Sequence, residues 1–298
     1  MKSGFVSIIG RPNVGKSTLL NHLLDTKVAI VSSKPQTTRS CLRGILTVPN
    51  RAQIIFVDTP GIHKPHHLLG RHIVQQALTV LQQVEWLLFL VDGTTPPGKG
   101  DHFIAKAISQ SNTPTYLLLN KLDKVKKKDW SQHLDAYWKL ASFKEIFFIS
   151  AKHKTNLEQL NRALIEVLPE GEFCYPEDQL TDQPETLMMA ELIREQVFRQ
   201  TGDEIPHAAT VWIEQVEERS PTLLAISAVI VVERQSQKGI VIGKQGSKLK
   251  EIGQEAFRET AYDWQKAIPT EILKLKKEKL TGKIKGKKEI NKKVKKSK

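Results

Sequence analysis

The stretch that decides the fold is Gly10-Arg11-Pro12-Asn13-Val14-Gly15-Lys16-Ser17, which follows an apolar run, Phe5 to Ile9, and precedes a helix-like segment, Thr18 to Leu24. Glycines permit backbone turns that other residues avoid, so successive NH groups can converge on one anion. The helix that follows directs the partial positive charge of its N-terminus to the same place. Lys16 would reach outer phosphates and Ser17 would ligate magnesium. The stretch therefore predicts a phosphate loop at a strand-to-helix junction of an α/β fold.

Three further motifs each follow an apolar run typical of a buried strand. They are Asp58-Thr59-Pro60-Gly61 after Ile54 to Val57, Asn120-Lys121-Leu122-Asp123 after Tyr116 to Leu119, and Ser150-Ala151-Lys152 after Ile146 to Ile149. A carboxylate at a strand end, such as Asp58, is suited to holding magnesium through water. Gly61 has no side chain where the backbone must approach a terminal phosphate. Together with the phosphate loop, these motifs predict a binding site for a nucleoside triphosphate and Mg²⁺.

The Asp123 motif indicates which base is bound. A carboxylate offers paired acceptors, and guanine presents a ring NH beside an exocyclic amine, whereas adenine has neither on that edge. Each hydrogen bond to this charged group is worth roughly 1.5 to 3 kcal/mol, and adenine would lose both and leave the carboxylate unpaired. The Asn120 to Asp123 motif therefore favours GTP over ATP. Taken singly, the Asn120 to Asp123 motif could be an ordinary strand-end loop, and Ser150 to Lys152 could be a helix cap.

Composition predicts two domains and a basic tail. The chain has 298 residues with 40% apolar content, enough for two cores. We predict a mostly parallel, doubly covered sheet over residues 1–168, with Cys41 to Val48 as an edge strand. A Pro- and Gly-containing linker, 169–184, then leads to a smaller α+β domain, 185–276. No apolar segment is long enough to span a bilayer, and two cysteines in separate regions fit the cytoplasm.

The second domain predicts the element order α-β-β-α-α-β of a type II KH module. Its central signal is Gly243-Lys244-Gln245-Gly246, placed between two helix-like segments, where bare backbone can lie against nucleotide phosphates. A helix C-cap glycine followed by a turn would look similar. We predict single-stranded RNA binding, with Val241 and Ile242 lining an apolar groove. The predicted RNA-binding residues are Ile242, Gly243, Lys244, Gln245, Gly246 and Lys248.

The net charge of +13 is concentrated at the C-terminus. Residues 271–298 carry 13 Lys and 3 Glu, a net +10. We predict that 277–298 is a mostly disordered tail with nonspecific attraction for phosphate groups. The alternative to sequence-specific recognition of a nucleic acid is a solvated tail that binds nothing specific.

The chain resembles the Era family of bacterial GTPases over about residues 3 to 275. The resemblance is carried by GRPNVGKSTLLN, KPQTTRS, DTPGIHKP, NKLD, SAK and ERQSQKGIVIGKQGSKLKEIG. It implies a Ras-like domain that hydrolyses GTP in assembly of the small ribosomal subunit (30S), and a KH groove that holds the 3′ end of its ribosomal RNA. It also implies a cytoplasmic protein with peripheral association with the inner face of the cell membrane, and we expect a monomer.

The resemblance also suggests roles for residues in the loops. Gln36-Thr37-Thr38-Arg39-Ser40 would be the first switch, with Thr38 or Thr37 reaching magnesium. Ile62 stands where Ras-like enzymes have a water-orienting glutamine, so intrinsic hydrolysis should be slow. Asn13 could ligate a potassium ion or make a plain loop hydrogen bond. The predicted catalytic residues are Lys16, Ser17, Thr38 and Gly61, the metal ligands are Ser17, Thr38 and Asp58, and the GTP-binding residues are Gly10 to Ser17, Asp58 to Ile62, Asn120 to Asp123 and Ser150 to Lys152.

The chain departs from the family pattern at two places. Lys154 stands where the family often has glycine, and Ile272 to Lys276 with the Lys-rich extension replace the usual end of the KH domain. Two other functions stay open at this level. The chain could bind RNA and use GTP structurally with little hydrolysis, or it could be a membrane-surface adaptor that acts through its tail.

Overall fold

The computed structural model describes residues 1–31, 42–59, 79–125, 127–202, 205, 209–220 and 223–264. The chain forms two compact units, Met1–Asp182 and Gln183–Lys298. Thr38, Pro60, Gly61 and Ile62, the expected last strand 270–275 and the basic tail lie outside the described residues.

The first unit is built on a six-stranded sheet with the order β2-β3-β1-β4-β5-β6. Its strands are β1 (Lys2–Ile9), β2 (Leu42–Val48), β3 (Ala52–Asp58), β4 (Trp86–Asp92), β5 (Thr115–Asn120) and β6 (Glu145–Phe148). β2 pairs antiparallel with β3 at one edge, and the remaining pairs are parallel. The predicted mostly parallel sheet and its edge strand are confirmed.

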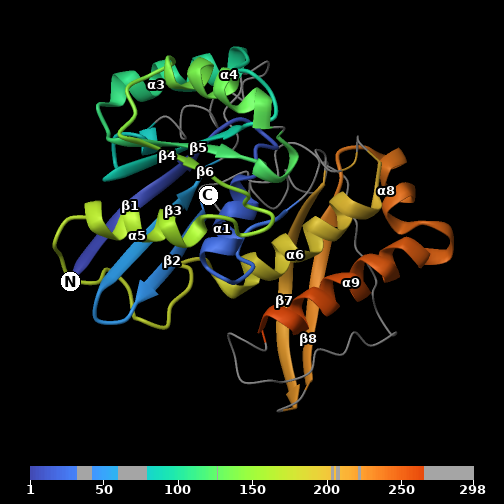
Figure 1. Cartoon of the computed structure of the whole chain (residues 1–298). Helices are drawn as coiled ribbons and strands as arrows, with labels where there is room; N and C mark the ends of the chain where they lie inside the picture. The colour runs from blue at the N-terminus through green and yellow to red at the C-terminus, as the bar shows by residue number, and fades with distance from the viewer. Residues whose placement is uncertain are drawn as a thin grey trace. The chain divides into compact units, whose positions relative to one another are not determined.

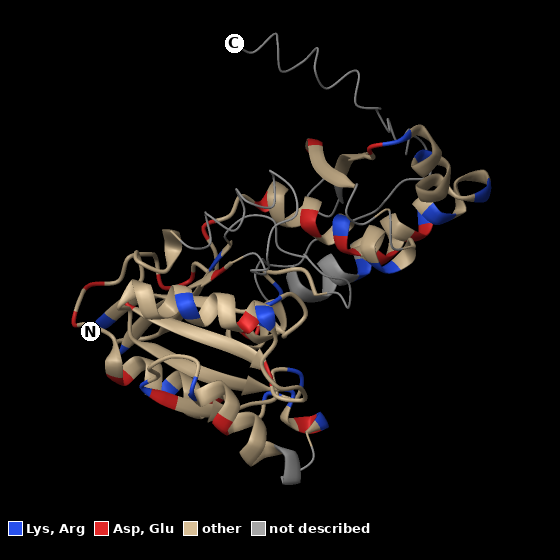
Figure 2. Cartoon of the chain, turned by 90° about the horizontal axis from the view of Figure 1, so that it is seen from above, with Lys and Arg blue, Asp and Glu red and all other residues tan. Residues whose placement is uncertain are grey.

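Helices cover both faces of this sheet because its strands are apolar on both sides. The helices are α1 (Lys16–Leu23), α3 (Lys99–Ser111), α4 (Lys127–Trp138) and α5 (Leu157–Val167), with a short 3-10 turn η1 (Leu122–Lys124). α3 and α4 lie on one face, and α1 and α5 on the other (Figure 1). Phe89 of β4, Ile104 of α3 and Tyr137 of α4 belong to one buried cluster between these layers. In Figure 2 the charged residues of this unit gather on helices and loops, while its strands are largely uncharged.

Four of the parallel strands end at the motifs that the sequence singles out. β1 runs into the phosphate loop, β3 ends at Asp58, β5 ends at Asn120 and β6 leads to Ser150. The register pairs Ile8 with Asp58. Since the carboxyl ends of parallel strands meet at one edge, this arrangement brings all four motifs to the same edge of the sheet.

The segment predicted as a linker packs along the open edge of the sheet up to Asp182. The NH of Ile45 on β2 donates to the Leu180 carbonyl (2.8 Å). Arg43 Nη1 lies 2.6 Å from Asp182 Oδ2. Gln53, fully buried, donates through Nε2 to the Tyr175 carbonyl and accepts from the NH of Cys174. The boundaries at 168, 184 and 276 stay predictions, while the first compact unit extends to residue 182.

Among its described residues, the second unit contains a helix, a β-hairpin and two further helices. They are α6 (Glu185–Gln200), β7 (Thr210–Ser220), β8 (Leu223–Val231), α8 (Gln235–Ile242), the 3-10 turn η2 (Lys244–Gly246) and α9 (Ser247–Trp264). β7 and β8 pair antiparallel with two register shifts. This order matches the expected α-β-β-α-α-β through its fifth element. Among the described helices, none has the length and apolar composition needed to cross a bilayer.

Candidate nucleotide-binding site and nucleic-acid interface

The phosphate loop takes a backbone path that demands its two glycines. Gly15 has φ 107°, and a Cβ there would lie 2.5 Å from Asn120 Nδ2. A Cβ on Gly10 would lie 2.3 Å from the Leu90 carbonyl oxygen. Asn13 also has a left-handed φ of 64°. The first glycine is therefore required by the neighbouring strand β4, and the second by both the turn and the base motif.

Lys16 is held inside this loop. Its Nζ donates to the carbonyl oxygens of Gly10 (3.2 Å) and Arg11 (3.1 Å). Burial lowers the pKa of the Lys16 ammonium, and the negative charge of Asp58 partly opposes that shift. A buried ammonium gains strongly from a nearby anion, so this position suits a phosphate group.

Ser17 and Asp58 lie together at the edge of the sheet. Ser17 Oγ donates to Asp58 Oδ2 over 3.2 Å, and both residues are buried. Thr59, which follows, donates through Oγ1 to the Ile8 carbonyl (3.0 Å), which fixes the chain next to Asp58. A hydroxyl and a carboxylate are oxygen ligands of the kind Mg²⁺ prefers, so this pair fits the ion. The predicted third ligand, Thr38, lies outside the described residues.

The Asn120 side chain makes two hydrogen bonds to backbone groups of the protein. Nδ2 donates to the Val14 carbonyl (2.7 Å), and Oδ1 accepts from the NH of Ala151 (2.8 Å). The residue is 3% exposed. Asn120 thus joins the phosphate loop, the Asn120 to Asp123 motif and the Ser150 to Lys152 motif. Its side chain positions the site, and its contact with the nucleotide stays a prediction.

Asp123 presents the carboxylate expected to recognise the base. Ser150 Oγ donates to Asp123 Oδ1 over 2.6 Å. That hydrogen bond, together with the nearby His153 and Lys124, holds the pKa of the Asp123 carboxyl below its ordinary value, although partial burial acts in the opposite direction. Asp123 is exposed, so its ionised carboxylate can accept hydrogen bonds from a ligand.

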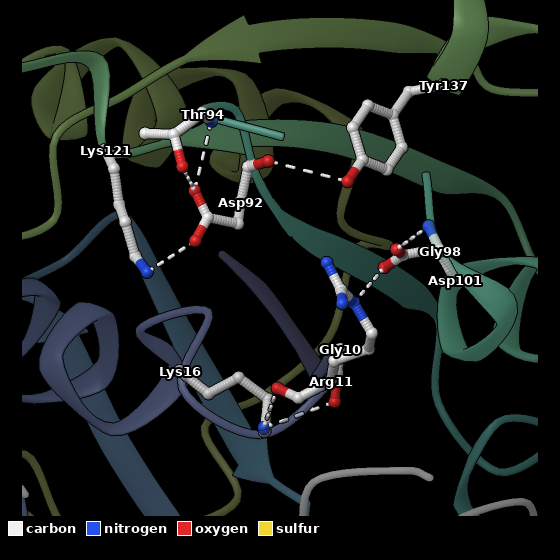
Figure 3. A network of polar contacts seen from close by, with 9 residues as sticks. All are labelled: Gly10, Arg11, Lys16, Asp92, Thr94, Gly98, Asp101, Lys121 and Tyr137. Atoms are coloured by element: carbon white, nitrogen blue, oxygen red, sulfur yellow. Dashed lines mark hydrogen bonds and ion pairs between the residues drawn. The ribbon is translucent and has the colours of Figure 1, made fainter. Parts of the chain in front are cut away.

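Lys121 has a partner that the sequence motifs did not include. Its Nζ lies 2.6 Å from Oδ2 of Asp92, the last residue of β4 (Figure 3). Thr94 donates to Asp92 Oδ1 through its NH and its hydroxyl. Burial raises the pKa of the Asp92 carboxyl, but the hydrogen bonds from Lys121 and Thr94 outweigh it and leave the pKa lowered. Asp92 ends a strand in register with Asn120, a signal that could have identified it.

A strained position follows two residues after the last base motif. Lys154 has φ 57°, a left-handed conformation that glycine adopts without cost. This explains why glycine suits the position. Ala151 is buried, and its carbonyl contacts His22 Nδ1 of α1. Lys152 is exposed. The Ser150 to Lys152 motif is therefore held by α1 and by Asn120.

The second unit presents the GxxG loop between α8 and α9. Gly243 and Gly246 have φ 71° and 77°, and a Cβ on Gly243 would lie 2.7 Å from Lys248 Cβ. Lys244 and Gln245 are exposed at the tip. Lys248 instead donates from Nζ to the Gln200 carbonyl (2.7 Å), at the end of α6. The loop therefore offers its backbone and Lys244 to a ligand more directly than Lys248.

One expectation about the apolar groove is wrong. Val241 is 0% exposed and packs in the core of the second unit with Ile230 and Ile252. It cannot line a groove, because α8 turns that side chain inward. Ile242 is half-buried against the same core, whereas Ile240 is 49% exposed.

A phosphate loop, an oxygen-ligand pair for magnesium and an Asn-Lys-x-Asp motif at one edge of a parallel sheet define a P-loop GTPase, here followed by a KH domain. A family model described as 50S ribosome-binding GTPase matches residues 5–121, and a KH domain model matches residues 204–296. GTPase Era of Heliobacterium modesticaldum is 48% identical over 259 residues, which cover 87% of this chain and 86% of that protein. GTPase Era of Lacticaseibacillus paracasei is 48% identical over 257 residues, covering 86% and 85%.

Two solved structures are similar along most of the chain. A variant of Era from Aquifex aeolicus bound to GDP and AlF4⁻ superimposes with a TM-score of 0.84 at 40% identity, covering 89% of this chain and 90% of the other. Era in complex with MgGDPNP and nucleotides 1506–1542 of 16S ribosomal RNA also gives 0.84 at 40% identity, covering 92% and 93%. The chain belongs to the Era family of GTPases, and it hydrolyses GTP.

Proposed function

We propose that this chain is a GTP- and magnesium-dependent switch that binds the 3′ end of small-subunit ribosomal RNA through its KH domain and acts in assembly of the small subunit. The observation that carries the proposal is the bridge made by Asn120, which holds the phosphate loop and the base motif as one site. The RNA part is supported by the exposed GxxG loop and by the relative solved with a 16S ribosomal RNA fragment.

In this proposal each end of the nucleotide has its own residues. Lys16, Ser17 and Asp58 hold the phosphates and the ion, and Asp123 accepts from guanine. Magnesium, when bound, neutralises charge on the phosphate oxygens. The buried Lys16 ammonium stabilises charge that develops during hydrolysis, because it is already desolvated and directed into the loop. The proposed roles of Thr38 and Gly61 come from the sequence alone.

The RNA part of the proposal uses the loop around Lys244. Because the loop backbone is nearly bare, consecutive phosphates can approach its NH groups. Lys244 adds charge at the tip, and the half-buried Ile242 flanks the loop. By linkage, if GTP changes RNA affinity by a given factor, RNA must change GTP affinity by the same factor.

The test measures RNA affinity in both nucleotide states. A labelled oligonucleotide with the 3′-terminal sequence of small-subunit ribosomal RNA is titrated with the full chain bound to GDP or to a non-hydrolysable GTP analogue. A scrambled oligonucleotide of equal length is the control for sequence. Lys244→Glu should weaken binding, whereas Lys139→Glu, the same charge change on an exposed residue of the first unit, should not. Equal affinity for both oligonucleotides, or no effect of nucleotide on RNA affinity, would refute the proposed switch.

The salt dependence supplies a second readout. Single strands lose about 0.7 log units of affinity per phosphate contact per log unit of salt, so Lys244→Glu should reduce the slope by about that amount if Lys244 makes one contact. A changed affinity with an unchanged slope would place Lys244 outside the phosphate contacts.

Three finer parts of the proposal have their own tests. We infer that Asn13 ligates potassium, so hydrolysis should be faster in KCl than in NaCl and Asn13→Ala should remove the difference. The basic tail associates with the cytoplasmic face of the cell membrane, at about 1 kcal/mol per basic residue near anionic lipid. Deleting 277–298 should abolish binding to anionic vesicles. The chain acts as a monomer, which sedimentation at several concentrations would test.

A further inference from the structure

We propose that Arg11 is a positioning residue of the GTP site, which fixes the phosphate loop on the N-terminus of α3 through an ion pair with the buried carboxylate of Asp101. The proposal rests on the proposed nucleotide site. An arginine in a phosphate loop would ordinarily suggest a cation that touches phosphate. Here Arg11 Nε donates to Asp101 Oδ1 over 2.8 Å, so the guanidinium is already used within the protein (Figure 3).

Asp101 has reasons of its own to require a cation. The residue is 0% exposed, and its Oδ2 accepts from the NH of Gly98 (2.8 Å), the N-cap of α3. A carboxylate at a helix N-terminus is favourable, but complete burial of its charge is costly without a paired cation. Arg11 supplies that positive charge, and the pair joins the phosphate loop to a helix 90 residues further along the chain.

The chain makes room for the Arg11 stem with a glycine. A Cβ on Gly100 would lie 2.8 Å from Arg11 Cδ and 3.0 Å from Cγ, and one on Gly98 would lie 3.5 Å from Nη1. Gly100 stands in the first turn of α3, and glycine is a weaker helix former than alanine. Its presence is explained by the packed arginine. The stretch Gly98 to Asp101 thus gains a function that no nucleotide motif assigns to it.

The Arg11 side chain also lies next to the fully buried Tyr137 of α4. Burial and the charge of Asp101 raise the pKa of the Tyr137 hydroxyl, which Arg11 partly opposes. That hydroxyl donates to the Asp92 carbonyl (3.4 Å), and the Asp92 carboxylate holds Lys121. The polar groups around Arg11 therefore extend from the phosphate loop toward the base motif.

Arg11 acts on the nucleotide through Lys16. Its carbonyl oxygen accepts from Lys16 Nζ (3.1 Å), so the anchored side chain sets the position of an atom that orients the ammonium. A loop held in place before binding loses less conformational entropy when the nucleotide arrives. Releasing Arg11 should therefore weaken GDP and GTP by similar factors, because both present phosphates to the same loop.

The test compares four variants of the full chain, three single and one double. Arg11→Gln, Asp101→Asn and their double substitution remove the ion pair, and Gly100→Ala displaces the arginine while keeping both charges. Arg258→Gln is the control, since Arg258 is exposed and pairs with Glu255 within α9 of the second unit. Affinities for GDP and GTP are measured with fluorescent analogues, and hydrolysis is followed in single turnovers at saturating GTP.

We expect each single substitution to lower the affinity for GDP and for GTP about tenfold. The double substitution should lower these affinities no further than the more damaging single substitution does. The single-turnover rate at saturating GTP should fall by less than about tenfold. The substitutions remove binding energy that the ground state and the transition state share, and such a loss affects this rate little. The control should match the unsubstituted chain in all three measurements.

The proposal is overturned if Arg11→Gln lowers the single-turnover rate by about 10³-fold while GDP affinity is unchanged, as for an arginine that acts on the transferring phosphate. It is also overturned if Asp101→Asn leaves nucleotide affinity unchanged. If Asp101→Asn does not fold, Gly100→Ala decides by the same criteria. Failure of the unsubstituted chain to bind GTP would instead remove the nucleotide site itself.

Discussion

Replacing Asn120 with alanine should damage both the stability of the first unit and its affinity for nucleotide. The substitution removes two hydrogen bonds, to the Val14 carbonyl and from the Ala151 NH. Val14 and Ala151 are 1% and 2% exposed, so water cannot readily replace the lost side chain. A buried polar group left without a partner costs about 1 to 3 kcal/mol, so the two together should cost about 2 to 6 kcal/mol of unfolding free energy. That is a large part of the free energy of unfolding of a typical domain, which is roughly 5 to 15 kcal/mol.

The assay must separate a local effect on the site from general destabilisation. Denaturant unfolding of the nucleotide-free chain is followed by pulsed hydrogen exchange of peptides from β5, so that the first unit is measured by itself. GDP affinity is measured on the same samples. Gln53→Ala is the matched control, because Gln53 is a buried amide of the same unit that also bonds to backbone groups.

Gln53→Ala should lower the unfolding free energy and leave GDP affinity unchanged, because its partners lie in the segment along β2. Asn120→Ala should lower both. If Asn120→Ala kept the unfolding free energy within about 0.5 kcal/mol of the unsubstituted chain, the cost assigned to its buried partners would be refuted. If it lost stability but kept GDP affinity, the bridge would not position the site.

Three other predictions concern the base motif. Ser150→Ala removes the 2.6 Å hydrogen bond to Asp123 and should reduce the preference for GTP over ATP by about tenfold, measured by competition binding; an unchanged preference would contradict it. Asp92 has a lowered pKa in the folded state, so its contribution to stability is present above its unfolded pKa of about 3.9 and is lost as pH falls through the folded value. Asp92→Asn should flatten that part of the acid unfolding curve. Lys154→Gly should raise the unfolding free energy by up to about 1 kcal/mol because it relieves a left-handed φ of 57°; a decrease in denaturation midpoint would contradict this.

Much of the fold could be predicted because local patterns report burial directly. Strands buried on both faces, such as β3, are continuous apolar runs, and the less apolar β2 lies at the edge. The motifs follow those runs, and strand geometry alone brings the carboxyl ends of parallel strands together. The GxxG loop could also be predicted from the sequence, because its turn requires glycines. Both glycines have positive φ values in the structure.

The use of individual side chains could not be predicted in the same way. Asn120 and Arg11 belong to nucleotide motifs, yet their side chains bond to Val14, Ala151 and Asp101. Val241 precedes the RNA loop, yet it is buried in the core. The partners of Asn120 and Arg11 come from distant parts of the chain, and no spacing rule connects them. Val241 is buried because α8 packs that side chain into the core of the second unit.

The sequence by itself determined the kind of protein, because phosphate, magnesium and guanine each demand particular residues at strand ends. Only the tertiary structure decided which of those residues face the ligand and which hold the site together. Hydrogen bonds and ion pairs depend on distances of about 3 Å between groups far apart in the chain, and those distances exist only after the strands and helices have packed.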